Sequence, residues 1–87
     1  SLPYDESRKP YLWLLYYRQK GYQQKHGRYA ATLKQLGIET ADYTITGVHN
    51  KLKMEATSRQ FMVYLSDGTN TFTINENGLV QKINARL

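Results

Sequence analysis

The sequence has no cysteine and no long apolar run. The first absence excludes disulfide bonds and thiolate metal sites. The longest apolar stretch, Tyr11–Tyr17, is far shorter than the roughly 18 residues of a membrane-spanning helix. No signal peptide is visible either. Because the chain starts at Ser1-Leu2-Pro3 without Met, we expect it to be an excised part of a longer protein.

Acidic residues are missing between Arg8 and Lys34, although this stretch is rich in basic ones. The formal net charge of +5 is therefore unevenly placed. Basic residues mixed with tyrosine fit a polyanion or nucleic-acid surface, or an ordinary solvated helix face. We favour the solvated face and do not expect nucleic acid as a partner. The basic residues of this stretch are Arg8, Lys9, Arg18, Lys20, Lys25, Arg28 and Lys34.

Catalytic and metal-binding patterns are also missing. His26 and His49 do not stand in a metal-ligand spacing, and no Ser or Thr lies in a nucleophile motif. No glycine loop suited to phosphate is present. The carboxylates are not placed as an acid and nucleophile pair. We therefore expect no catalytic residue, no metal and no cofactor, and we predict that the chain is not an enzyme.

The strongest positive signal is an amphipathic helix at the N-terminal end. Apolar residues recur at helical spacing from Leu12 to Tyr22, and His26-Gly27 is a stop signal. Residues 1–9 are predicted as a linker or lead-in, with Asp5 or Ser7 as N-cap; with Ser7, Pro10 falls in the first turn. Residues 10–87 are predicted as a single α+β domain.

A short second helix is expected over Leu33–Leu36, capped by Thr32 and closed by Gly37. After it the apolar period changes from 3.6 to 2. Turns at Ser58-Arg59, Asp67-Gly68 and Asn77-Gly78 separate four antiparallel strands.

A further extended piece over Tyr43–Val48 stays open, because Gly47 and His49-Asn50 interrupt it. We expect a four-stranded antiparallel β-meander with one apolar face. That face needs a cover, and the long helix is the only amphipathic element available. The predicted core is Leu12, Leu15, Tyr16, Tyr22, Leu33, Leu36, Phe61, Val63, Phe72 and Ile74.

The first turns of the helix are apolar on nearly every side, which predicts burial against something outside this chain. Exposed aromatic rings could also stack on sugars or on bases. We prefer packing against a neighbouring domain or subunit. The candidate interaction surface is Tyr11, Trp13, Tyr17, Arg18 and Lys20.

The order of a helix, the segment HGRYAATLKQLGI and a meander resembles the globular heads of type IV pilins and type II secretion pseudopilins. In those heads a G-x-Y-P-x-x-L-x-x-L-like segment follows the helix. The matching residues are Gly27, Tyr29, Leu33 and Leu36. This resemblance implies a pilin-head-like fold and a component of a secretion or filament system.

A second resemblance covers residues 11–83. The segments YYRQKGYQQKHGRYAATLKQLGI, LKMEATSRQFMVYL and FTINENGLV are similar to a C-terminal, pilin-like extension of bacterial extracytoplasmic proteins that carry a family-9-like carbohydrate-binding domain. The resemblance implies a non-catalytic accessory domain in the periplasm or at the cell surface. Its partner would be a neighbouring domain or another subunit, and carbohydrate would be bound through the parent protein.

Overall fold

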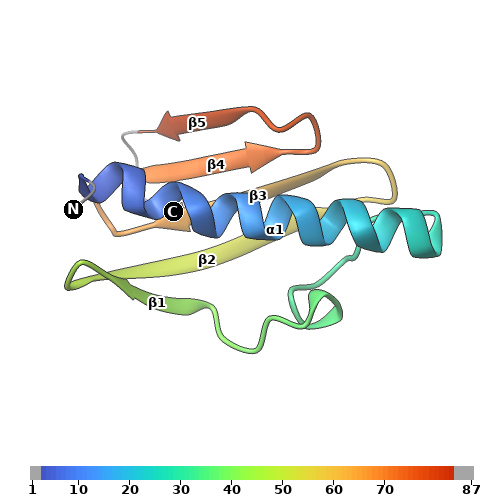
Figure 1. Cartoon of the computed structure of the whole chain (residues 1–87), viewed down its shortest axis with the longest axis horizontal. Helices are drawn as coiled ribbons and strands as arrows, with labels where there is room; N and C mark the ends of the chain where they lie inside the picture. Colours follow the sequence, from blue (N-terminus) through green and yellow to red (C-terminus); the bar gives the residue numbers. More distant parts are fainter. Residues whose placement is uncertain (1–2, 84–87) are drawn as a thin grey trace.

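One long helix lies across a single antiparallel sheet in the computed structural model, which describes residues 3–83 (Figure 1). Helix α1 spans Tyr4–His26, and a 3-10 turn, η1, spans Lys34–Leu36. The strands pair in sequence order, so the sheet is a meander, and the predicted α+β class is confirmed. The strands are β1 Asp42–Ile45, β2 Val48–Ala56, β3 Phe61–Ser66, β4 Thr71–Asn75 and β5 Val80–Ile83.

The sheet has five strands, so the prediction of four was wrong. The added strand is β1, which pairs with β2 through the turn Thr46-Gly47. Both turn residues have positive φ, 47° and 80°, as hairpin turns of two residues require. Thr is a poor residue for this conformation, so the turn has no clear sequence signal. His49-Asn50, which looked like an interruption, lies within β2.

Helix α1 also begins earlier than predicted. Pro3 is the N-cap residue, and Tyr4 is the first helical residue, so neither Asp5 nor Ser7 caps the helix. Pro10 lies inside the helix, on its exposed side, rather than in its first turn. The part of the predicted lead-in from Tyr4 to Lys9 is therefore helical, whereas residues 1–2 lie outside the described residues.

The other end of α1 agrees with the prediction. Gly27 takes the left-handed conformation with φ 76°, and its N–H donates to the Gln23 carbonyl at 2.8 Å. The predicted second helix is the three-residue 3-10 turn η1, closed by Gly37. The N-cap residue of η1 is Leu33, so the prediction of Thr32 as the cap was wrong, although Thr32 Oγ1 accepts a hydrogen bond from the Gln35 N–H at 3.3 Å.

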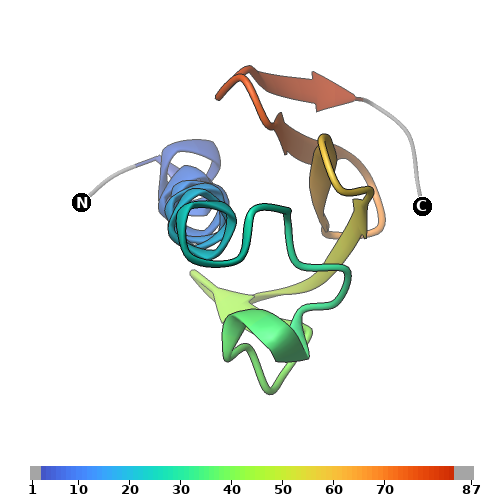
Figure 2. The same cartoon turned by 90° about the vertical axis from the view of Figure 1, so that its right-hand side faces the viewer.

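The core lies between α1 and the concave face of the sheet, which curls around the helix when viewed along the helix axis (Figure 2). The strand register puts the apolar side chains of neighbouring strands on this face: Leu52 is opposite Leu65, and Leu65 is opposite Phe72. The buried apolar residues are Leu12, Leu15, Tyr29, Ala30, Leu36, Ile38, Ile45, Leu52, Phe61, Val63, Leu65, Phe72 and Ile74.

All ten predicted core residues contribute to this core. Tyr16, Tyr22 and Leu33 are half-buried and pack against its edge, whereas the others are buried. Gln19 is fully buried on the same stripe of α1. Its amide donates to the Ala30 carbonyl at 2.9 Å and accepts from the Ala30 N–H at 2.8 Å, and so holds the returning chain under the helix.

The strained turn before β2 gives a stability prediction. Because Asn tolerates positive φ better than Thr, Thr46→Asn should raise the free energy of unfolding by about 1 kcal/mol. Urea unfolding followed by circular dichroism measures it. Thr44→Asn, at an exposed position of β1, is the matched control and should give no such gain. Equal effects of the two substitutions would contradict strain at Thr46.

Candidate functional site

The five residues of the predicted interaction surface do not share one face of α1. At 100° per residue, Tyr11 and Arg18 fall on the flank toward β1 and η1. Trp13 and Lys20 fall on the opposite flank, where Trp13 adjoins the turn between β4 and β5 and Lys20 contacts Tyr29. Tyr17 alone projects away from the sheet, with 66 % of its surface exposed.

On the first flank, both side chains support chain segments beside the helix. The Tyr11 ring lies 5.1 Å from the Tyr43 ring of β1, measured between centroids. The Arg18 guanidinium donates to the Leu36 carbonyl at 2.8 Å, at the end of η1. Tyr11 therefore has a structural role, and Arg18 is anchored at one of its nitrogens.

On the second flank, Trp13 lies against Gly78. A Cβ atom at Gly78 would be 3.5 Å from Trp13 Cη2, so the indole covers the β4–β5 turn. Lys20 donates to the Tyr29 hydroxyl at 2.9 Å. This hydrogen bond raises the pKa of Lys20 above 10.5, because it outweighs the opposing effect of burial.

An exposed apolar strip runs along the outside of α1. We call Pro10, Leu14, Tyr17 and Gly21 the outer strip; their spacing of four, three and four residues puts them in one line. Leu14 is 44 % exposed, and a Cβ atom at Gly21 would meet nothing within 4 Å. The Tyr17 ring also adjoins Trp13, with centroids 6.0 Å apart. This strip is apolar, and the ring contacts of Tyr17 are with its helix neighbours Trp13 and Tyr16, not with the sheet.

Sequence reasoning missed the most buried charged group of the chain. Arg8, assigned to a solvated face, has no exposed surface. Its Nε donates to Asn50 Oδ1 at 3.0 Å, and its Nη2 donates to the Leu65 carbonyl at 3.0 Å. Its Nη1 donates to Asn70 Oδ1. The guanidinium therefore joins α1 to β2, to β3 and to the β3–β4 turn.

Asp67 and Tyr4 complete this network. Asp67 Oδ2 lies 3.7 Å from Arg8 Nη1 and accepts from the Tyr4 hydroxyl at 2.8 Å. The Asn50 amide donates to the same hydroxyl at 3.0 Å. Desolvation raises the pKa of Tyr4 above 10.0. We call Tyr4, Arg8, Asn50, Asp67 and Asn70 the Arg8 cluster.

Burial raises the pKa of the Asp67 carboxyl, but other interactions outweigh it. The N–H groups of Asn70 and Thr69, the Tyr4 hydroxyl and the charge of Arg8 all favour the carboxylate. The pKa of Asp67 therefore lies below its ordinary value of 3.8. No buried side-chain nitrogen or oxygen of residues 3–83 lacks a hydrogen-bond partner. The buried polar atoms of the cluster are satisfied within the fold, which gives the cluster a structural role.

One signal could have revealed the Arg8 cluster. Arg8 precedes Leu12, Leu15 and Gln19 by four, seven and eleven residues, so it extends the buried stripe of the helix. A basic residue on such a stripe requires acceptors from the sheet.

Carboxylates near surface depressions already have partners. A depression of about 590 Å³ at the β2–β3 turn includes Glu55 and Glu76 in its lining. The Tyr64 hydroxyl donates to Glu55 at 2.8 Å, and this bond raises the pKa of Tyr64 above 10.0. Glu76 accepts from the Phe61 N–H at 3.4 Å. Within residues 3–83, no three His, Cys, Asp or Glu side chains are grouped to hold a metal.

Comparison of the chain with known protein families, with curated proteins and with solved structures finds no match. In the part of the chain that the structure describes, no helix combines the length and the apolar character needed to cross a membrane.

Removal of the Arg8 side chain should be costly. Arg8→Ala leaves Asp67 and the two asparagines without their shared donor, so the free energy of unfolding should fall by about 3–5 kcal/mol. Arg8→Lys keeps the charge but not the planar fork of donors, and should lose less. Urea unfolding measures both variants. Arg59→Ala, on the exposed β2–β3 turn, should change stability by less than about 0.5 kcal/mol. A small loss for Arg8→Ala would show that the cluster is dispensable.

The lowered pKa of Asp67 predicts that the folded domain loses stability in acid. Its pKa is lower in the folded state, so its contribution is complete well above 3.8 and disappears as the pH falls through the folded pKa. Urea midpoints measured between pH 6 and pH 2.5 should fall less steeply for Asp67→Asn than for the unchanged protein. Glu39→Gln, at an exposed position, is the control and should keep the original slope. Equal slopes for Asp67→Asn and the unchanged protein would contradict the assignment.

Proposed function

We propose that this chain is a non-catalytic interaction domain that packs against a protein partner through the outer strip of α1. The observation that carries the proposal is the exposure of Leu14 and Tyr17, at 44 % and 66 %, on the helix that covers the core. Large apolar side chains in one line are typical of a helix surface that a partner covers. Basic side chains such as Arg18 and Lys25 flank the strip, so a partner surface with acidic residues at its rim fits best.

The proposed partner is a neighbouring domain of the same polypeptide or another subunit. The similarity to the extension of family-9-like carbohydrate-binding proteins supports a sugar-binding module as that neighbour, in an extracytoplasmic protein. In this proposal, carbohydrate is bound by the module and not by the 87 residues themselves. Enzymatic activity is not part of the proposal, because the carboxylates of the β2–β3 depression already hold structural partners.

A pilin-like component of a secretion or filament system is the second candidate. The observation that favours it is the segment after α1, in which Tyr29 and Leu36 are buried under the helix and the meander follows directly. This segment carries the residues on which the resemblance to pilin heads depends.

The absence of cysteine makes the docking proposal directly testable. Tyr17→Cys places a single thiol of this domain on the outer strip, and Arg59→Cys places one on the β2–β3 turn. Thiol labelling rates are measured for the isolated domain and for the full polypeptide of its gene. If the strip is docked, labelling at position 17 should slow by about tenfold or more in the full polypeptide, because only the undocked fraction reacts.

Labelling at position 59 should be unchanged, which controls for general effects of the larger protein. Equal rates at position 17 in both forms, repeated with the purified subunits of its assembly, would refute docking through the strip. Sugar binding to the full polypeptide, with none to the isolated domain, supports the first candidate. Incorporation into filaments without sugar binding supports the second.

A further inference from the structure

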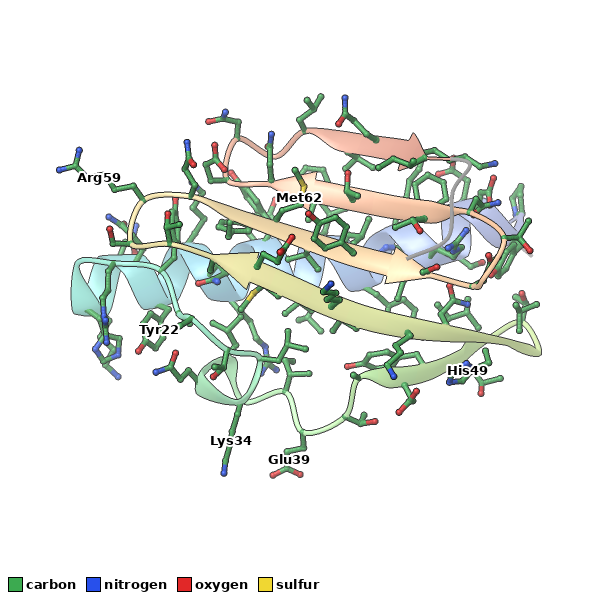
Figure 3. All side chains as sticks on the ribbon, turned by 180° about the vertical axis from the view of Figure 1, so that it is seen from behind. Tyr22, Lys34, Glu39, His49, Arg59 and Met62 are labelled. Atoms are coloured by element: carbon green, nitrogen blue, oxygen red, sulfur yellow. The ribbon has the colours of Figure 1, made fainter. Side chains whose placement is uncertain are left out.

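A basic groove lies between the last turns of α1 and the 3-10 turn η1. It has a volume of about 300 Å³, at the lower end of the range for small-molecule sites. Arg18, Tyr22, Lys25 and His26 line it from the helix, and Gln35 lines it from η1. Figure 3 shows Tyr22 between the helix and the η1 segment, whereas Lys34 points away from the fold. Gly21 of the outer strip also lines the groove, so the two surfaces adjoin on α1. A site for a small ligand nevertheless goes beyond the proposed function.

Basic side chains at the start of α1 have acidic partners, whereas those near its end have none among the described residues. At the start of α1, Arg8 and Lys9 pair with acidic side chains, and Lys82 pairs with Asp5. Within residues 3–83, no carboxylate lies within 4.0 Å of a basic nitrogen of Arg18 or Lys25. The sequence has no acidic residue between Glu6 and Glu39, so the helix end and the returning loop are cationic without a local counter-charge.

The negative end of the α1 dipole also lies near this groove and acts against an anion. Its effect is equivalent to about half an elementary charge. The Gly27 N–H already satisfies one of the last carbonyls, that of Gln23. Arg18 and Lys25 contribute two full positive charges, so the field in the groove remains favourable for anions.

Arg18 is held in place for such a contact. Its Nη1 donates to the Leu36 carbonyl at 2.8 Å, and a Cβ atom at Gly37 would be 3.1 Å from the same nitrogen. A guanidinium has five N–H donors, so this anchor leaves others for a bidentate contact with an oxyanion. The side chain therefore needs little further ordering to bind.

The helix side of the groove also carries two aromatic rings. The Tyr22 and His26 rings lie 4.2 Å apart between centroids, with an interplanar angle of 36°. This tilted pair offers aromatic surface to a flat or apolar organic group. The groove thus combines two cations with an aromatic wall in a volume of small-molecule size.

We propose that this groove binds a small organic phosphate ester, with the phosphate on Arg18 and Lys25 and the organic group against Tyr22. Phosphate is preferred to a carboxylate because its tetrahedral oxygens can contact both cations at once, and its charge approaches −2 near neutral pH. Guanidinium and ammonium groups are the ordinary side-chain partners of phosphate.

The test is an NMR titration of the isotopically labelled domain at low ionic strength. The probes are adenosine 5′-monophosphate, glucose 6-phosphate, inorganic phosphate and uncharged glucose. Phosphate esters should bind with a Kd on the order of 1 mM and shift the signals of residues 18–26 and 35–37. Glucose should give no shifts, and inorganic phosphate should bind more weakly than the esters.

Two variants test the residues. Lys25→Gln and Arg18→Gln should each weaken binding of the esters by about tenfold. Lys25 makes no hydrogen bond that holds the fold in the described residues, so its variant stays informative if Arg18→Gln loosens η1. Arg59→Gln removes an exposed charge from the β2–β3 turn. Arg59 does not line the groove and points away from the fold (Figure 3), so this variant should leave the affinity unchanged.

The proposal is overturned if the esters cause no saturable shifts of the NMR signals. It is also overturned if Lys25→Gln and Arg59→Gln weaken the binding of the esters equally. If inorganic phosphate binds as tightly as the esters, the role of the aromatic wall is overturned. The proposal is also overturned if a short oligonucleotide or a vesicle of anionic lipid binds more than about a hundredfold tighter than the esters. The ligand would then be a polymer or a membrane surface rather than a small molecule.

Discussion

The fully buried guanidinium of Arg8 is the constraint on which the arrangement of this small domain depends. A charge without exposed surface is tolerated only where hydrogen bonds and a counter-charge replace water. Asn50, Asn70, Asp67 and the Leu65 carbonyl meet that requirement, and they come from three separate parts of the sheet. The helix can therefore lie on the sheet in one position only, because a shift along its axis would leave the cation without its acceptors.

Different parts of α1 are held by different interactions: the Arg8 cluster holds its start, and apolar packing holds its middle. The middle of the helix contributes Leu12 and Leu15 to a core formed with the strands, while its C-terminal part holds the returning chain through Gln19. Most side chains on its two flanks contact the chain segments beside them. The outer strip and the basic groove remain available for partners, and they adjoin at Gly21, which belongs to the strip and also lines the groove.

Much of the fold could be predicted because periodicity and turn residues agree with it. Asp67-Gly68 and Asn77-Gly78 mark real hairpins, and the stripe of Leu12 and Leu15 marks the buried side of the helix. The sequence did not decide whether β1 is a strand, because its turn contains Thr46, a residue that rarely adopts positive φ. The helix start was misplaced because Pro10 looked like a first-turn residue. The candidate surface was harder to predict: whether Tyr11 is free depends on β1, whose pairing no local pattern indicates.

The contact between Trp13 and Gly78 has a practical consequence for spectroscopy. Trp13 is the single tryptophan of the chain, and its indole covers the turn that joins β4 to the edge strand β5. Its fluorescence emission therefore reports on whether this edge hairpin is attached to the helix, while far-ultraviolet circular dichroism reports mainly on the helix itself. Coincident transitions of the two signals would mean that edge and helix melt as one cooperative unit. An earlier shift of the emission would identify β4–β5 as the part of the sheet that opens first.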